Sequence, residues 1–385
     1  MTAPAPRLPA YGTASLSDLV PSLLAALDVP GFANPLGIEP LDRACLLVVD
    51  GLGSALLERY GAEAPFLSSL RAPAITAGFP ATTAASIASI GTGRPPGEHG
   101  LVGYTMGLPG HDRAINALLW ETYGVGPKVD LRDTVVPEDL QPEPTAFERA
   151  AADGVAVSLV GPVHHEHSGM TRAVLRGGRY RGAFSLGDLA AQAAHALTGA
   201  RRTLVYAYDP ALDATGHARG CDSVAWRWQL GHVDRVAQTI AEQLPSGAAL
   251  VVTGDHGMVD LRASDKIDLA DEPDLAGGVR LLSGEARARH VHTEPGAAAD
   301  VEAAWQARLG DRMWVRTRDD AIASGWFGPV VADRVRARIG DVVAAAFAPV
   351  GVFQRAVDPM QARYTGHHGS MTPEEQLVPF ALIRR

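Results

Sequence analysis

Short runs of apolar, often β-branched residues recur along the chain and end abruptly in polar or glycine-rich segments. Such runs are typical of strands that are buried on both faces of a parallel sheet. The clearest predicted strands are 45–49, 155–160, 203–207, 250–253 and 378–383. Segments with helical periodicity separate them, at 16–27, 54–60, 83–90, 189–197 and 224–243.

The alternation of strands and helices predicts an α/β fold of three layers, in which helices cover both faces of a mostly parallel central sheet. Between residues 261 and 339 the pattern changes to short strand-like pieces around one helix, at 279–282, 289–293, 313–317 and 300–309. We interpret this stretch as a smaller inserted α+β subdomain. The core would then comprise residues 1–260 and 340–385.

Composition supports a folded protein with a large core, since 46% of the 385 residues are hydrophobic and only 20% are charged. The sequence holds no apolar run of about 20 residues that could cross a membrane. The first thirty residues lack the basic start and apolar stretch of a secretory signal, and Cys45 and Cys221 are too few for a disulfide framework. We therefore expect a cytoplasmic protein that does not bind membranes.

The formal net charge of −9 disfavours a nucleic-acid polymer as a partner, because binding a polyphosphate backbone requires a basic face. A small anionic substrate remains compatible with this charge if metal ions supply the positive charge. The next question is therefore whether the chain carries a metal site.

Acidic side chains follow the predicted strands at the position where open α/β sheets bind their ligands. Asp50 ends the segment CLLVVD and precedes a Gly-Leu-Gly turn. Asp255 and His256 follow the strand 250–253 in the segment ALVVTGDHG. Each residue alone is more often a helix cap or a turn former.

Two further segments add histidines to this set. Asp213 and His217 are four residues apart in DPALDATGHARG, which brings both to one face of a helical turn. His368 belongs to TGHHGS, shortly before the last predicted strand. Carboxylate and imidazole together suit zinc better than calcium or magnesium, which prefer oxygen ligands. The combination indicates a site for two divalent metal ions, with Zn²⁺ expected and Mn²⁺ as the alternative.

The segment GFPATTAASIASIGTG predicts a helix of small residues that begins at Thr82 or Thr83. The simpler interpretation is a capping threonine. A hydroxyl at a helix N-terminus that also binds a divalent cation ionises more readily, however, and becomes a nucleophile. The segment is not a P-loop, because GTGRPPGEHG lacks the Gly-Lys-Ser/Thr ending.

The order of these motifs resembles the alkaline phosphatase superfamily, and most closely its nucleotide pyrophosphatase/phosphodiesterase branch, from about residue 43 to the C-terminus. That branch carries a strand-end Asp, a nucleophilic Thr before a Thr-Gly pair, a D-x-x-G-H, a D-H-G and a late H-G in this order. The matching residues here are Asp50, Thr83, Asp213, His217, Asp255, His256 and His368.

The resemblance implies a role for each matching residue. One metal would be held by Asp213, His217 and His368. The other would be held by Asp50, Thr83, Asp255 and His256. The spacing to Thr92-Gly93 selects Thr83 over Thr82 as the nucleophile.

Two segments near the expected site depart from that branch or add to it. Where the branch carries an Asn that contacts phosphate, this chain reads HGLVGY, so Tyr104 takes that position as a substrate-binding residue. The segment GPVHHEHSGMTR, with His164, His165 and His167, follows a strand and could form a wall of the substrate pocket. A solvated polar loop is the favoured interpretation, because the metal ligands are complete without it.

The resemblance implies a metal-dependent hydrolase of small phosphate esters, of the phosphodiesterase or nucleotide pyrophosphatase type, that acts through a phospho-threonine intermediate at Thr83. A phosphomonoesterase or a phosphonate hydrolase of the same superfamily would share the metal ligands. An alternative of another class is a non-catalytic metal-binding protein. The presence of the candidate nucleophile Thr83 beside all six Asp and His ligands argues against this alternative. A sulfatase is disfavoured because neither cysteine lies in a C-x-P-x-R context.

We also expect diesters or nucleotide-type pyrophosphates to be cleaved faster than monoesters. The charges of two divalent cations would be balanced by three carboxylates and the ionised Thr83, so a dianionic monoester would need an additional cationic clamp. Arg94 lies at the far end of the helix that Thr83 begins. Arg172, in the segment SGMTR, is the first alternative clamp to consider.

Overall fold

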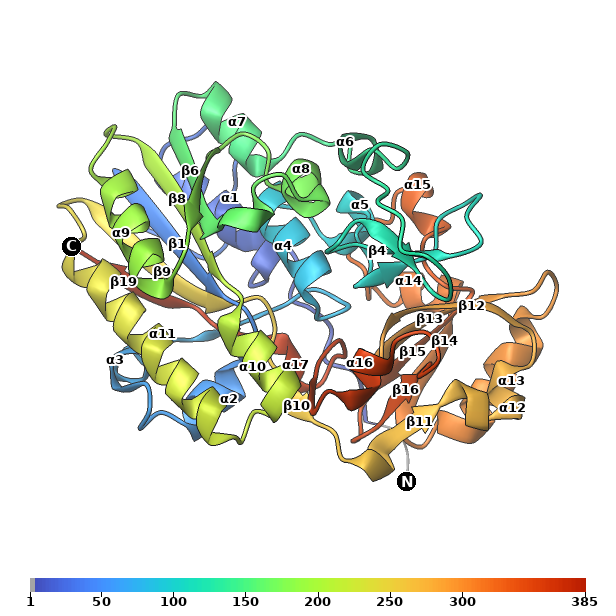
Figure 1. Ribbon diagram of the computed structural model, residues 1–385. Coiled ribbons are helices and arrows are strands. Elements are labelled where there is room, and N and C mark those ends of the chain that lie inside the picture. The colour runs from blue at the N-terminus through green and yellow to red at the C-terminus, as the bar shows by residue number, and fades with distance from the viewer. Residues whose placement is uncertain (1–3) are drawn as a thin grey trace.

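The computed structural model describes residues 4–385, and its centre is a six-stranded sheet with the order β19-β9-β1-β8-β6-β7 (Figure 1). The strands are β1 (Arg43–Val49), β6 (Ala156–Pro162), β7 (Arg179–Ala183), β8 (Thr203–Asp209), β9 (Ala248–Gly254) and β19 (Ala381–Arg384). The β1 strand pairs in parallel with β8 and β9, and β6 pairs in parallel with β7 and β8. The prediction of a mostly parallel central sheet is confirmed.

Side chains alternate between the two faces of the sheet along each strand, and apolar clusters bury both faces. In β1, Leu46 and Val48 enter one apolar cluster, whereas Leu47 and Val49 enter the other. Helices that pack into the first cluster are α1 (Leu16–Ala26), α4 (Thr83–Thr92) and α7 (Ala146–Ala152). Helices that pack into the second are α2 (Ser54–Arg59), α9 (Leu186–Leu197) and α11 (Val224–Glu242). The fold therefore has the three predicted layers (Figure 1).

The last predicted strand, 378–383, is divided into two. β18 (Leu377–Pro379) pairs antiparallel with β2 (Ala74–Thr76), and β19 then runs antiparallel to β9 at the edge of the central sheet. The break falls at Pro379, which has no amide hydrogen to donate to a continuing ladder. The expectation of a parallel strand here is wrong for this edge of the sheet.

A second sheet, antiparallel throughout, has the order β12-β13-β15-β14. Its strands are β12 (Val279–Glu285), β13 (Ala288–Thr293), β14 (Met313–Thr317) and β15 (Val342–Ala346). Helix α13 (Ala298–Leu309) packs against β14 and β15. β15 lies between β13 and β14, and β16 (Gly351–Phe353) pairs with β11 (Lys266–Asp268). The boundary expected at residue 339 is thus too early, because strands as far as residue 353 pair within this part of the chain.

Across residues 4–385, none of the helices has both the length and the apolar character needed to span a membrane.

Candidate active site

The carboxyl ends of three neighbouring strands carry acids to one edge of the central sheet. Asp50 follows β1, Asp255 follows β9, and Asp213 lies in the first turn of α10 (Ala211–Arg219), directly after β8. Gly51 has a φ of 77°, and a Cβ there would lie 3.1 Å from Cα of Asp213. The close approach of the β1 turn to α10 therefore requires glycine at this position.

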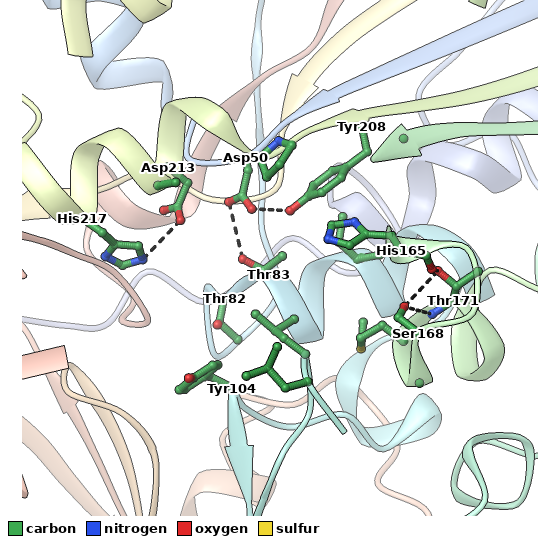
Figure 2. Close-up of a pocket in the computed structure, with 18 of the residues that line it drawn as sticks. Asp50, Thr82, Thr83, Tyr104, His165, Ser168, Thr171, Tyr208, Asp213 and His217 are labelled. Carbon is green, nitrogen blue, oxygen red and sulfur yellow. Dashed lines mark hydrogen bonds and ion pairs between the residues drawn. The ribbon is translucent and has the colours of Figure 1, made fainter. Parts of the chain in front are cut away.

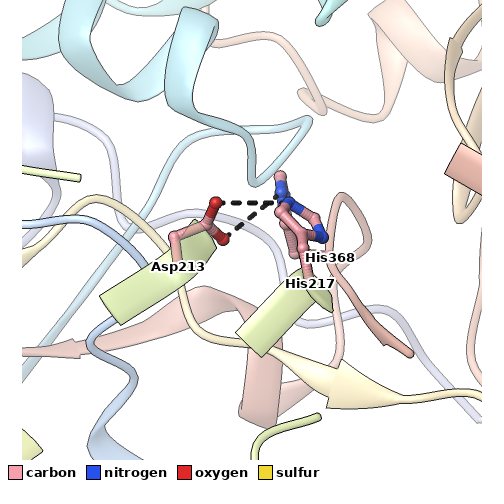
Figure 3. Close-up of side chains that lie close together, drawn as sticks. All are labelled: Asp213, His217 and His368. Atoms are coloured by element: carbon pink, nitrogen blue, oxygen red, sulfur yellow. Dashed lines mark ion pairs between the residues drawn. The ribbon is translucent and has the colours of Figure 1, made fainter. Parts of the chain in front are cut away.

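The first cluster of candidate metal ligands consists of Asp213, His217 and His368 (Figure 3). Oδ2 of Asp213 lies 3.2 Å from Nε2 of His217, and Oδ1 lies 3.9 Å from Nε2 of His368. The first two residues share a face of α10, as their spacing predicts. His368 arrives from β17 (Gly366–His367), which pairs with β10 (Val259–Asp260) shortly after the Asp255 loop.

The second cluster surrounds His256, which is fully buried (Figure 2 shows the neighbouring Asp50 and Thr83). Its Nε2 lies 3.3 Å from Oδ1 of Asp50 and 3.6 Å from Oδ2 of Asp255. The hydroxyl of Thr83 lies 3.2 Å from the same nitrogen and 3.4 Å from Oδ1 of Asp50. Asp213 offers an oxygen within 4.8 Å of ligand atoms of Asp50 and His256, so the two clusters adjoin.

The two candidate threonines differ in position. Thr82 is the N-cap of α4, with extended backbone angles, and Thr83 is the first residue of the helix. The hydroxyl of Thr83 faces Asp50 and His256, whereas Thr82 lies on the side of Tyr104 (Figure 2). The structure therefore places Thr83, the threonine that the motif spacing selected, next to the candidate metal ligands Asp50 and His256.

All three histidines of the clusters are oriented by backbone carbonyls. Nδ1 lies 2.8 Å from Gly366 O in His217, 3.1 Å from Gly257 O in His256 and 2.9 Å from Ala81 O in His368. A carbonyl only accepts, so Nδ1 carries the proton and Nε2 presents its lone pair to the site. Burial, and then the stacked His256 ring, also lower the pKa of His368 well below its usual range, which keeps this ring neutral.

The carboxylates hold more negative charge than their surroundings compensate. Burial raises the pKa of Asp50 well above its usual range, and the Asp255 and Asp213 carboxylates add to the shift. Burial also raises the pKa of Asp255. Burial acts in the same direction on Asp213, but His217 outweighs it and lowers the pKa of this group. Two of the three acids are thus unfavourable as anions unless a cation lies between them.

Two buried oxygens test whether the residues fit metal ions. Oδ1 of Asp213 and Oδ2 of Asp255 have no hydrogen-bond partner among residues 4–385. Buried carboxylate oxygens are normally satisfied, and each of these faces a histidine nitrogen with a free lone pair. The donor set, three carboxylates with three imidazoles, is one that zinc-class ions prefer. The residues therefore fit divalent metal ions.

A cavity of about 820 Å³ opens beside both clusters. Thr83 and Tyr104 line it, as do His164 and His165, whereas His167 is exposed and does not. His164 is exposed as well, so the expectation of a solvated loop holds for His164 and His167, whereas His165 is half-buried. Burial, and then the neighbouring His164, lower the pKa of His165 to about 4, so this ring presents a neutral wall.

Arginines contribute little positive charge to the cavity. Arg172, which the sequence suggested as a clamp, is not among the lining residues, and Glu138 binds it through two hydrogen bonds. Arg132 does line the cavity, but Asp130 and the carbonyl of His167 engage its guanidinium. The site must therefore obtain its positive charge from elsewhere.

Three further residues of the site were missed in the sequence. Tyr208 donates its hydroxyl proton to Oδ2 of Asp50 (Figure 2). Asn116 donates from Nδ2 to the hydroxyl of Tyr104 at 2.8 Å, which leaves the phenol proton free for a ligand. Glu285, from β12, reaches the cavity wall. The parallel register of β1 and β8 places Tyr208 opposite Val48 and so near Asp50, and no local pattern in the sequence indicates any of the three.

Comparison with known proteins gives this arrangement a family. The family model described as type I phosphodiesterase / nucleotide pyrophosphatase matches residues 44–371, most of the chain. The chain belongs to this family. The resemblance stated from its motifs is confirmed, as is the expectation of a hydrolase of phosphoric esters. No curated protein matches the chain by sequence.

Solved structures share the fold at low sequence identity. Murine ectonucleotide pyrophosphatase / phosphodiesterase 5 matches with a TM-score of 0.62 and 16% identity over 87% of each chain. Phosphonoacetate hydrolase from Sinorhizobium meliloti 1021, in complex with phosphonoformate, matches with a TM-score of 0.64 and 18% identity over 89% of this chain and 90% of that one. An inactive variant of the murine protein in complex with AMP matches with a TM-score of 0.60 and 15% identity over 87% of each chain.

Proposed function

We propose that this member of the type I phosphodiesterase/nucleotide pyrophosphatase family hydrolyses phosphodiesters or nucleotide-type pyrophosphates with two metal ions of the zinc class and Thr83 as nucleophile. The single observation that supports this most is the position of the Thr83 hydroxyl, 3.2 Å from His256 and 3.4 Å from Asp50, between the candidate ligands of one ion. A hydroxyl with a purely structural role would cap α4, and Thr83 does not occupy the cap position.

Asp213, His217 and His368 would hold one ion, and Asp50, Asp255, His256 and Thr83 would hold the other. Two such ions, when bound, supply Lewis acidity, lower the pKa of a hydroxyl or water and neutralise phosphoryl charge. Asp213 would serve as the link between the ions, because its oxygens lie within reach of both clusters.

Thr83 would attack phosphorus through its hydroxyl oxygen and form a phospho-threonine ester, with departure of the alcohol or phosphate leaving group. Free amides at the N-terminus of α4 favour the negative charge that develops next to Thr83. Water then hydrolyses the ester and restores the threonine. His256 and Asp50 orient the Thr83 oxygen in both steps, because both lie within 3.4 Å of it.

The comparisons support the substrate class by analogy. The inactive murine relative solved with AMP carries an alanine in place of a threonine. A cavity of about 820 Å³ leaves room for a second ester group of nucleotide size beside the clusters. Phosphonoacetate hydrolase has the same fold, so a phosphonate remains the alternative substrate to include in the test.

Hydrolysis of bis(4-nitrophenyl) phosphate, 4-nitrophenyl phosphate, a dinucleoside polyphosphate and phosphonoacetate should be compared after chelation and after reconstitution with Zn²⁺ or Mn²⁺. We expect metal-dependent cleavage of the diester and pyrophosphate. Burst kinetics with a phosphorylated Thr83 peptide would support the covalent step. Activity that is unaffected by complete chelation would exclude the proposal.

A further inference from the structure

Glu285 stands at the tip of the second sheet, where β12 and β13 meet. It pairs with Ala288 across the hairpin, so the two-residue turn between them brings the second sheet to the wall of the reaction cavity. The residue is only 4% exposed. Thr82, Thr83 and Tyr104 line the same cavity. A buried acid thus reaches the cavity of the nucleophile from a part of the chain that contributes no candidate metal ligand.

The two oxygens of this carboxyl group have different surroundings. Oε1 accepts a hydrogen bond of 2.5 Å from the amide of Tyr104. Oε2 is buried and has no hydrogen-bond partner among residues 4–385. An unsatisfied buried carboxyl oxygen is costly, and a group bound in the cavity can remove that cost. The structure therefore leaves one oxygen of Glu285 to a ligand.

The charged and polar groups that face Glu285 come from the elements packed around it. Arg289 lies on β13 and is engaged by the carbonyls of Val352 and Gly284. On the opposite side, a Cβ at Gly369 would lie 3.1 Å from Cβ of Glu285, next to His368. Burial raises the pKa of Glu285 to about 7, against the effects of the Tyr104 amide, the Thr82 side chain and the Arg289 charge, in that order. An anionic phosphoryl group nearby would favour the neutral acid further.

We propose that Glu285 is a substrate-contacting residue, which donates a hydrogen bond from protonated Oε2 to a non-bridging oxygen of the phosphoryl group at Thr83. This inference rests on the proposed function, from which it takes the attack of Thr83 on a phosphoryl group. A neutral carboxylic acid supplies a donor without adding negative charge to an already acidic cavity. It would complement Tyr104, which lines the same cavity.

Two substitutions distinguish the role of Glu285 as a hydrogen-bond donor from the role of its negative charge. Glu285→Gln keeps an acceptor for the Tyr104 amide and a permanent donor in place of the acid. We expect its kcat/KM for the diester to stay within about threefold of the unmodified enzyme at pH 7, whereas Glu285→Ala should lower it by about 10²-fold. A large loss in Glu285→Gln would overturn the inference, because the negative charge would then be what matters.

A pH profile separates donation to substrate from simple bracing of Tyr104. An ionised Glu285 still accepts from the Tyr104 amide but has no proton to donate. Bracing predicts that the ratio of kcat/KM in the unmodified enzyme to that in Glu285→Gln is independent of pH. Donation predicts that this ratio falls, by about tenfold per pH unit, above the pKa of Glu285. Groups that bind metal titrate in both proteins, so their contribution cancels in the ratio. A flat ratio between pH 6 and 9 would overturn the inference.

A binding measurement makes this test independent of turnover. Inorganic phosphate should be titrated calorimetrically into the zinc-loaded Thr83→Ala protein, with and without Glu285→Ala and Glu285→Gln. We expect Glu285→Ala to weaken phosphate binding by about tenfold and Glu285→Gln to preserve it. Equal affinities would overturn the role of Glu285. If instead the unmodified enzyme cleaves no ester while Glu285→Ala weakens phosphate binding, the proposed function fails and this contact stands.

Discussion

The hydroxyl oxygen of Thr83 lies 3.2 Å from Nε2 of His256, although the two residues are 173 positions apart in the chain. The ring proton of His256 is directed to the carbonyl of Gly257, so the lone pair of Nε2 faces the threonine oxygen. An alkoxide and an imidazole lone pair repel each other unless a cation lies between them. Thr83 can therefore act as an alkoxide nucleophile beside His256 only when a metal ion lies between the two.

Replacing Thr83 by Ala should lower kcat by at least about 10⁴-fold, because covalent catalysis is lost while the other ligands remain. Circular dichroism should show an unchanged fold, and elemental analysis should show most of the metal retained. Thr82→Ala is the matched control, since it removes the adjacent hydroxyl, and it should lower kcat by less than about tenfold. If the two phenotypes are exchanged, the nucleophile is Thr82.

Metal content provides a second prediction. The protein as isolated, or reconstituted with Zn²⁺, should hold two ions per chain, and His217→Ala should lose one of them preferentially. Asp213→Ala should weaken both ions, because its carboxylate reaches both clusters. Elemental analysis after dialysis measures each case. A fully active preparation with a single ion would contradict the binuclear assignment.

Tyr208 should affect metal binding without touching the metal. Its hydroxyl donates to Oδ2 of Asp50, and removing it leaves a buried carboxylate oxygen without that donor. We expect Tyr208→Phe to weaken the ion held by Asp50 by about 10-fold to 100-fold, as a zinc competition assay would show. Tyr206→Phe removes a hydroxyl two residues earlier on the same strand face and should leave this affinity unchanged. Equal effects of the two substitutions would assign the loss to packing.

The buried ion pair between Arg287 and Glu375 should stabilise the fold. Two hydrogen bonds of 2.7 Å join them, and Glu375 also accepts from the Ser370 amide and the Thr372 hydroxyl near His368. Arg287→Met leaves a buried carboxylate unpaired and should cost about 3–5 kcal/mol in the free energy of unfolding of the metal-free protein.

An exposed ion pair supplies the control for this stability prediction. Arg308 and Glu272 are joined by two hydrogen bonds at the surface, where solvent screens the charges. Arg308→Met should therefore cost about 0–1 kcal/mol. Urea denaturation measures both variants. A cost for Arg287→Met no larger than that for Arg308→Met would show that the buried pair contributes nothing net.

The residues that could be predicted from the sequence are those with local signals. Asp50 and Asp255 end continuous apolar strands, and Asp213 and His217 have helical spacing. The sequence therefore predicts the element on which each of these residues lies. The edge strand Arg179–Ala183 was missed because its side chains are partly exposed and no continuous apolar run marks it. β15 lies beyond the boundary expected at residue 339, and only its pairing with β13 and β14 assigns it to the second sheet.

Contacts between residues on distant segments could not be predicted from the sequence. Glu285 stands in a hairpin whose approach to Thr83 depends on how the second sheet packs against the core. Arg172 had the right charge and lay near a candidate wall, but its side chain pairs with Glu138 outside the cavity. Spacing predicts which residues share an element, whereas the direction of a side chain depends on its tertiary neighbours.

The final prediction is that diesters are cleaved faster than monoesters. Asp50, Asp213 and Asp358 line the cavity, and Arg132, the one lining arginine among the described residues, is already paired with Asp130. A monoester brings a dianion to this acidic wall and finds no unpaired arginine to hold it. A diester carries one negative charge less, and its second ester group can occupy the cavity beside Tyr104 and His165.

The ratio of kcat/KM for bis(4-nitrophenyl) phosphate to that for 4-nitrophenyl phosphate should therefore exceed about tenfold with the same metal and pH, which corresponds to about 1.4 kcal/mol of differential transition-state binding. Asp130→Asn provides the internal test, because it would free Arg132 from its partner. Monoester cleavage should then rise relative to diester cleavage. A clear preference of the unmodified enzyme for the monoester would contradict the prediction and would mean that Arg132 leaves Asp130 to clamp the phosphoryl group. In that case Arg132→Ala should abolish the preference, while Arg172→Ala, which alters an arginine outside the cavity, should not.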